Sequence, residues 1–358
     1  MSEVLGICDC VRGAARAGTR RHAAAVYDAV AAPLLPAVAS LLPVFAAAGR
    51  SPVPLLKTFR DVAAAQLAFL PAAHAAALAT ASAEMVAAYA RHVPPPAAPP
   101  AAGAATAADD AAEEESYRQL KSLLELAGQL ASRDYGADAT APPGSDGAHE
   151  EAVGRAALSC VELLLPRLSP PLLHYPKLCA AYFSLLGHLL DAHPARVFAL
   201  PPPIAAAVLA SVDFGLGHHD NAIATRALNA SFELAKQAAL QPADVGAAMA
   251  PTLQALLHRV AVDVLCSRLH PDLADDAGNA LLALILAQPA HWQALVASLL
   301  AAQPDAGRRD AAAAAFHALL NANGLTPTLA RPNRARFRQN VQGLLQQVQS
   351  GGFVMPSG

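Results

Sequence analysis

Apolar segments with a helical period follow one another along this chain, separated by breaks of only a few residues. Within them, apolar residues recur at intervals of three and four, as on one face of an α-helix. Most prolines stand between these segments, where proline begins or ends a helix. Aromatic residues make up only 5% of the chain and β-branched residues are sparse, which disfavours strands. The sequence therefore predicts an all-α protein.

The predicted domain organisation follows from two interruptions in this pattern. A Pro/Ala-rich loop is expected over 93–112, after helices in 1–92, and a flexible loop over 134–149, after a single helix at 113–133. HEAT-like repeats ending in a capping helix are expected over 150–358. The predicted helices are 20–48 (bent at its prolines), 52–70, 73–92, 113–133, 150–167, 171–191, 201–216, 218–239, 243–268, 271–287, 289–301, 305–321 and 331–349.

These helices are predicted to form antiparallel pairs. Pair starts near 171, 218, 271 and 305 are roughly 35–55 residues apart, which overlaps the period of HEAT and armadillo repeats. The segment 178–190 carries two neighbouring apolar stripes, as a helix with neighbours on both sides requires. A buried helix of a compact bundle would look similar, but many short-linked helices in one row favour an α-solenoid, a superhelix of HEAT-like pairs.

Charge and cysteine content narrow the functional class. The formal net charge of −3 argues against a general nucleic-acid binder, which would carry a broad basic excess. Five cysteines, an odd and sparsely spaced set, indicate reduced thiols in the cytosol or nucleus rather than a disulfide framework. They are Cys8, Cys10, Cys160, Cys179 and Cys266.

The most apolar stretch lies at 23–45. It contains Asp28, three prolines and much alanine, whereas a membrane span is normally richer in leucine and freer of proline. We therefore expect buried helices here rather than membrane insertion. The N-terminus lacks the basic region and apolar core of a secretory signal, so none is expected.

No convergent set of catalytic or metal-binding residues is evident, so we expect no enzyme, no metal and no cofactor. His218, His219 and Asp220 are adjacent, and neighbours on a helix point about 100° apart. They are interpreted as a turn with Asp220 near the next helix start. Cys8 and Cys10 form a C-x-C without a second pair and are interpreted as small buried thiols.

An acidic strip is predicted on the helix at 271–287. Acids in the first turn of a helix complement its dipole, which is one explanation. The alternative is an acidic strip on the inner wall of a superhelix that binds a basic cargo. Another acidic run, at 109–120, is interpreted as an exposed helix start. The cargo-binding candidates are Asp272, Asp275, Asp276 and Asn279.

The last predicted helix carries four arginines within eight residues. Pro332 stands in its first turn, as helix starts favour, and glutamines lie opposite its apolar face, which suits a terminal repeat exposed to water. We interpret the arginines as a solvated rim rather than a nucleic-acid arm. The expected apolar face consists of Phe337, Val341, Leu344, Leu345 and Val348.

Several long stretches resemble the importin-β-like nuclear transport receptors, or karyopherins, and among them the exportins. They are "LLPVFAAAGRSPVPLLKTFRDVAAAQLAFL", "EEESYRQLKSLLELAGQLASRDY", "LLLPRLSPPLLHYPKLCAAYFSLLGHLLDAHPARVFALPPPIAAAVLASVDFGL" and "HWQALVASLLAAQPDAGRRDAAAAAFHALLNANGLTPTLARPNRARFRQNVQGLL". The similar features are the order of segments, the acidic run before "SYRQL" and the "TPTL" turn before the last helix. They are packing patterns rather than chemical motifs.

The resemblance implies a non-enzymatic HEAT-repeat receptor that shuttles between nucleus and cytoplasm. It implies binding of the Ran GTPase in its GTP form, of nuclear pore proteins, and of cargo such as translation factor 5A or Smad-type factors. The main Ran-contacting repeats of such receptors are N-terminal, and this chain is expected to start after them. It is then a fragment, a truncated gene model or one part of a longer receptor. A helical-repeat scaffold outside nuclear transport remains the alternative.

Overall fold

The computed structural model describes residues 2–95, 107–132, 147–168, 170–193, 196–197, 200–238, 243–265, 270–351 and 353–354. In these ranges every regular element is a helix and none is a strand, and the helices pack in adjacent pairs. The predicted all-α, solenoid-type fold class is thus confirmed. The chain forms two compact units, Met1–Ile204 and Ala205–Gly358.

Unit 1, Met1–Ile204, begins with α1 (Ser2–Ala17) and a bent helical segment, Arg20–Ala47. The bend contains a π-helical turn, η2 (Tyr27–Ala31), just before the prolines that interrupt regular hydrogen bonding. The other elements of the segment are η1 (Arg20–His22), α2 (Ala23–Val26), α3 (Ala32–Ser40) and α4 (Leu42–Ala47). The rest of the unit comprises α5 (Val53–Gln66), η3 (Leu67–Phe69), α6 (Ala72–His92), α7 (Ala107–Ala131), α8 (Gly147–Leu164), η4 (Leu165–Arg167), η5 (Pro170–His174) and α9 (Pro176–Ala192).

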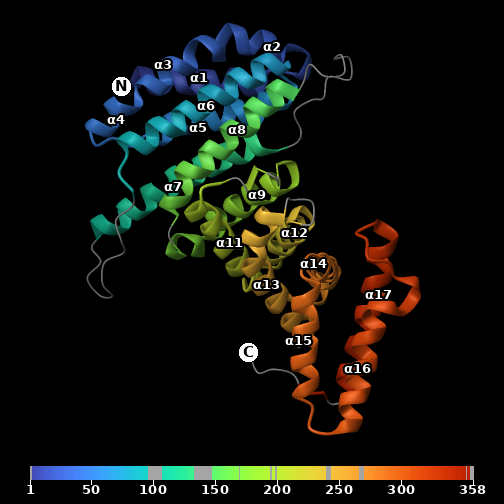
Figure 1. Cartoon of the computed structure of the whole chain (residues 1–358). Helices are drawn as coiled ribbons and strands as arrows, with labels where there is room; N and C mark the ends of the chain where they lie inside the picture. The colour runs from blue at the N-terminus through green and yellow to red at the C-terminus, as the bar shows by residue number, and fades with distance from the viewer. Residues whose placement is uncertain are drawn as a thin grey trace. The chain divides into compact units, whose positions relative to one another are not determined.

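The helices of unit 1 stack in two rows (Figure 1). In one row α1 packs against α5, α5 against α7, and α7 against α9; in the other, α3 and α4 pack against α6, and α6 against α8. A helix in the middle of a row therefore needs two buried faces. On α5, both Leu55 and Leu56 are fully buried, as are Phe59 and Val62, so this arrangement removes each inner helix from water.

A buried carboxylate links three helices of the first row. Asp61 of α5 is 5% exposed and accepts hydrogen bonds from Arg12 (2.7 Å) and Arg16 (2.5 Å) of α1. Its other oxygen accepts from Arg60, which also reaches Glu125 of α7 at 3.0 Å. Burial of an unpaired carboxylate would be costly, so the three guanidinium groups are what allow Asp61 to lie here.

Unit 2 consists of most of α11 (Pro202–Leu216), with α12 (Asn221–Ala238), α13 (Ala243–Leu265), η6 (Pro271–Leu273), α14 (Ala274–Ala287), α15 (Pro289–Ala301), α16 (Ala306–Asn321), η7 (Ala322–Gly324) and α17 (Arg331–Gly351). Here α12 packs against α14, which packs against α17, while α13 packs against α15, and α15 against α16. The central helix α14 is buried continuously from Ala280 to Ile285, because it has neighbours on several sides.

Two asparagines of α17 fix the turn that precedes it. Asn333, 2% exposed, bonds through its side chain to the backbone of Thr326 and Thr328. Asn340, 6% exposed, donates to the carbonyls of Leu319 (3.0 Å) and Ala322 (3.2 Å) at the end of α16. These bonds satisfy carbonyls that a helix end leaves free, so the α16–α17 turn is held by side chains rather than by apolar contact alone.

The structure corrects several expectations. Helix α1 was not among the predicted helices, and α7 begins at Ala107, inside the predicted 93–112 loop. The prediction of a buried thiol holds for Cys8 but is wrong for Cys10, which is exposed. Most of the predicted loops, 96–106 and 133–146, and Cys266 lie outside the described residues.

The face of α17 follows the prediction, except that Leu345 is only half-buried. The arginines of this helix do not all extend into solvent, as the predicted solvated rim requires. Arg331 and Arg336 are exposed, but the Arg334 guanidinium lies 5.3 Å from the ring centre of Phe232 on α12, and Arg338 reaches α14. Two of the four therefore hold α17 against its own unit.

The apolar segment Arg20–Ala47 is less buried than expected. Only 28% of its most apolar window is buried. Among the described helices it is the single continuous one long and apolar enough to cross a bilayer; Pro271–Ala287 and Pro289–Ala301 would qualify only as one span, but they meet at 110°. The expectation of buried helices at 23–45 thus holds for one side of the segment and not for the other.

Candidate functional site

The predicted acidic strip lies at the start of α14 and is contacted by α17. Arg338 places its Nε 3.2 Å from Oδ1 of Asp275 and donates from Nη1 to Oδ1 of Asn279 at 3.1 Å. The close approach depends on Gly278, where a Cβ would stand 3.0 Å from Cγ of Arg338. The strip is therefore partly paired within the protein.

The other acids of the strip have different surroundings. Asp272 is 78% exposed, and its backbone N–H donates to Nδ1 of His270 at 3.3 Å. Burial, and then the neighbouring Asp275, raise the pKa of Asp276; Arg338 opposes this without reversing it. The Asp275 side chain is 72% exposed even though it pairs with Arg338. The structure thus brings all four predicted residues together, with Asp272 and Asp275 accessible from solvent.

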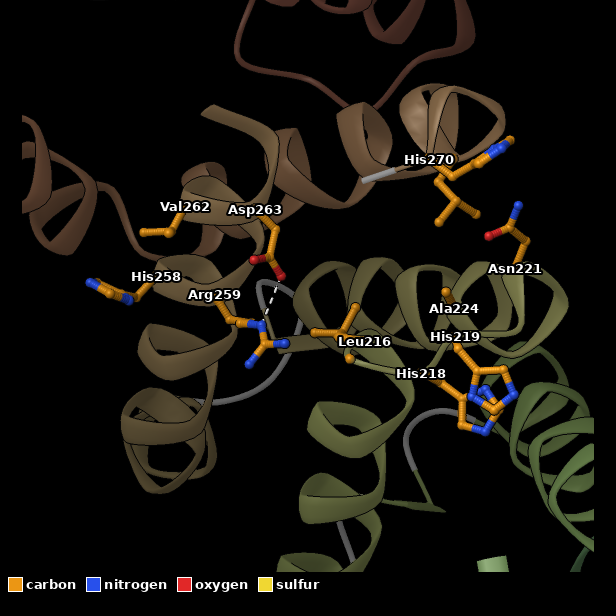
Figure 2. A pocket seen from close by; sticks show the side chains of 12 residues that line it. Leu216, His218, His219, Asn221, Ala224, His258, Arg259, Val262, Asp263 and His270 are labelled. Atoms are coloured by element: carbon orange, nitrogen blue, oxygen red, sulfur yellow. Dashed lines mark hydrogen bonds and ion pairs between the residues drawn. The ribbon is translucent and has the colours of Figure 1, made fainter. Parts of the chain in front are cut away.

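Next to the strip, unit 2 contains a pocket of about 750 Å³. Figure 2 shows side chains that reach it from the end of α11, from the α11–α12 turn, from α12 and α13, and from His270 just before η6. His270 lines the pocket and also contacts Asp272, so pocket and strip form one continuous surface. The lining residues are Leu216, Gly217, His218, His219, Asn221, Ala224, His258, Arg259, Val262, Asp263, His270 and Leu273.

In the lining of the pocket, the charged side chains of Arg259 and Asp263 pair with each other. Arg259 donates from Nε to Asp263 at 2.7 Å, and this hydrogen bond is the main reason that the pKa of Arg259 is raised. The remaining polar lining is mostly imidazole. The His218 and His219 rings stack at 4.3 Å.

The histidines do not form a metal centre. Figure 2 shows His258 on one side of the pocket and His270 on the other, both away from His218 and His219. Within the part of the chain that the structure describes, no three His, Cys, Asp or Glu side chains are placed to hold a metal ion. The expected turn is confirmed: Asp220 accepts from the backbone N–H of Ala222 at 2.8 Å, and α12 starts at Asn221.

Sequence reasoning identified the strip but not the pocket. Its histidines come from separate segments: His218 and His219 lie in the α11–α12 turn, His258 on α13 and His270 just before η6. His218 and His258 are 40 positions apart and His258 and His270 are 12 apart, and no local spacing relates them. Arg338 was likewise assigned to a rim, because its partner Asp275 lies on another helix. The only available signal was charge complementarity between a basic last helix and an acidic strip.

Comparison with known proteins identifies distant relatives. Exportin-7-B and Exportin-7-A of Xenopus laevis are each 27% identical to this chain over 215 residues. The match covers 56% of this chain and 20% of each relative, so the chain spans a small part of the length of the relatives it matches. No model of a known protein family matches the chain.

These relatives are consistent with a resemblance to nuclear transport receptors in general. They do not support a resemblance to one particular exportin. The narrower expectation, that these stretches resemble the C-terminal part of exportin-4, is not supported, because neither relative is that exportin. The chain is distantly similar to exportins over more than half of its length, and it folds as stacked helix pairs.

Proposed function

We propose that this chain is part of a nuclear export receptor that binds protein cargo in a manner dependent on Ran in its GTP form. The observation that carries the proposal is the similarity to two exportins across 215 residues. The stacked pairs of unit 1 support it, because such repeats present extended surfaces to protein partners. The chain acts by binding and not as an enzyme.

Stacked pairs also offer a physical route for regulation. Each pair contacts mainly the pairs beside it, so small changes at many interfaces add up to a change in the curvature of an array. If Ran and cargo each favour one curvature, their binding free energies are coupled, and each changes the affinity for the other by the same factor. In this proposal, nuclear pore proteins bind the receptor during shuttling between nucleus and cytoplasm.

The cargo surface is assigned to the acidic strip. Asp272 and Asp275 are exposed side by side at the start of α14, and Asp276 and Asn279 continue the same face. A surface of this sign favours a basic cargo and speeds its association. Translation factor 5A and Smad-type factors are the first cargoes to test.

The test uses the full-length gene product in a pull-down with purified Ran. Ran loaded with GTP should be captured, and Ran loaded with GDP should be lost in the wash. Equal capture of the two forms, or capture of neither, would instead favour the alternative of a helical-repeat scaffold outside nuclear transport. Cargo added with Ran-GTP should raise the captured amount of both proteins.

A further inference from the structure

Two residues beyond α17 are attached to the end of another helix of unit 2. Phe353 and Val354 follow α17, and Val354 is hydrogen-bonded to the side chain of Gln303. Gln303 stands two positions beyond Ala301, the last residue of α15, and is 5% exposed. We call Phe353 and Val354 the C-terminal strap, because they join the end of α17 to the end of α15.

The strap is held through its backbone. Nε2 of Gln303 donates to the carbonyl of Val354 at 3.0 Å, and Oε1 of Gln303 accepts from the N–H of Val354 at 3.1 Å. A side-chain amide presents a donor and an acceptor side by side, so it can pair with both backbone groups of one residue. Val354 itself is 44% exposed. Recognition at this point therefore depends on a backbone N–H and C=O rather than on the kind of side chain.

The same amide also caps α15. Nε2 of Gln303 carries a second hydrogen, which it donates to the carbonyl of Leu299 at 2.8 Å. Leu299 lies in the last turn of α15, where carbonyls have no partner within the helix. This bond orients the Gln303 side chain whether or not the strap is attached, so the site is preorganised for a backbone ligand.

The attachment of the strap is finely balanced. Phe353 is only half-buried and Val354 is exposed, so water can replace the two hydrogen bonds when they open, and their net contribution is small. Fixing the backbone of two residues has an entropic cost of similar size. By contrast, Asn333 and Asn340, which fix the turn before α17, are 2% and 6% exposed. The strap should therefore open far more readily than that turn.

We propose that the C-terminal strap is a conformational device that opens and closes on the end of α15 by backbone pairing with Gln303. When it is closed, the end of α17 is tied to the end of α15. When it is open, α17 is held by its packing against α14 and α16, and the Gln303 amide can bind another extended segment with a free backbone N–H. The device does not rest on the proposed transport role, and its test needs no Ran.

The probe is a dye-labelled peptide with the sequence of residues 350–358, added to the whole chain. The attached strap competes with this peptide as an intramolecular ligand, whose effective concentration is roughly millimolar. Since only molecules with an open strap can bind the peptide, its apparent affinity reports the open fraction. Fluorescence anisotropy measures the binding, and circular dichroism verifies that each variant is folded.

Val354→Pro opens the strap without altering the site, because proline has no backbone N–H to donate to Gln303. This variant should bind the peptide about ten-fold more tightly than the parent, as expected if the strap is open in about one parent molecule in ten. Val354→Ala keeps both backbone groups and is the matched control, which should bind the peptide as the parent does. A peptide with proline at the position of Val354 should bind none of these chains.

Gln303→Leu removes the site instead of the strap. The peptide should not bind this variant, and hydrogen exchange at the Val354 amide should be about ten-fold faster than in the parent. The proposal is overturned if the parent and Val354→Pro bind the peptide equally, or if neither binds it. It is also overturned if Gln303→Leu binds as tightly as Val354→Pro. Binding by Val354→Pro with none by the parent would equally contradict it, since the strap would then be a permanently closed part of the fold.

Discussion

Nε of Arg338 on α17 lies 3.2 Å from Oδ1 of Asp275 on α14, so the basic last helix and the acidic strip are partners within one unit. The pair is accessible to water, with Asp275 72% and Arg338 29% exposed. Exposed pairs of this kind contribute less than about 1 kcal/mol to stability. The acidic strip can therefore exchange Arg338 for a basic side chain of a partner at small cost.

The acids of the strip should differ in their effect on stability. Asp276→Asn should raise the thermal unfolding midpoint at pH 7.5, because burial and the nearby Asp275 disfavour the Asp276 carboxylate. The pKa of Asp276 is raised in the folded state, so protonation favours folding. The gain should therefore shrink as the pH falls through that raised pKa and vanish below the usual value of 3.8. Asp272→Asn, at a 78% exposed position, is the control and should leave the midpoint unchanged. A lower midpoint for Asp276→Asn would contradict this account of the strip.

Cargo binding should depend on the strip as a whole. Changing Asp272, Asp275 and Asp276 together to asparagine should weaken the binding of a basic cargo by about ten-fold or more at low salt, and less at high salt. The folded chain should persist, as circular dichroism would verify. Unchanged affinity in a titration of the full-length receptor would remove the strip from the cargo surface.

The buried carboxylate of unit 1 should control its acid stability. Burial alone raises the pKa of Asp61, but hydrogen bonds from Arg12 and Arg60 outweigh it, and the net pKa lies below the usual 3.8. The stabilisation is therefore present above pH 3.8 and is lost as the pH falls through the lower folded pKa.

Asp61→Asn should cost about 3 kcal/mol at neutral pH, since it leaves three arginines without their shared anion. Unfolding in urea at pH 7 and below pH 4 measures both effects, and the difference between variant and parent should shrink at the lower pH. Asp9→Asn is the control, because Asp9 also pairs with Arg12 but is 72% exposed. An equal loss of unfolding free energy in Asp61→Asn and Asp9→Asn would contradict a special stabilising role for the ion pairs of Asp61.

The thiols should differ in reactivity. Burial raises the pKa of Cys160 to about 12, so little thiolate forms at pH 8, and Cys8 and Cys179 are buried as well. Cys10 is exposed. Iodoacetamide should label Cys10 well before these three in the folded chain, and all of them in guanidinium chloride, as mass spectrometry of peptides would show. Rapid labelling of Cys160 in the folded chain would mean that this part of unit 1 opens readily.

The fold class was predictable because helical periodicity and proline position are local. Most predicted helices match within a few residues; for example, 73–92 corresponds to Ala72–His92 and 289–301 to Pro289–Ala301. Helix α1 was missed: its buried face is only Cys8, Val11 and Ala15, and its glycines lower helix propensity. The start of α7 was missed because an alanine-rich stretch after a proline run reads equally well as a loop.

The site was only partly predictable, since its contacts join distant segments. The periodicity of 271–287 placed Asp272, Asp275, Asp276 and Asn279 on one face, and they do lie together. Nothing in that stretch specifies Arg338, which is 63 positions from Asp275. The uncovered side of Arg20–Ala47 was missed for a related reason, because periodicity shows that 23–45 is apolar but not which side is covered.

The most direct test of the proposed receptor role is a titration of fluorescent Ran, loaded with GTP or with GDP, against the full-length gene product. The account predicts that the GTP form binds at least about ten-fold more tightly and that cargo increases this difference. Equal affinity for the two nucleotide forms, or no binding of either, would contradict it.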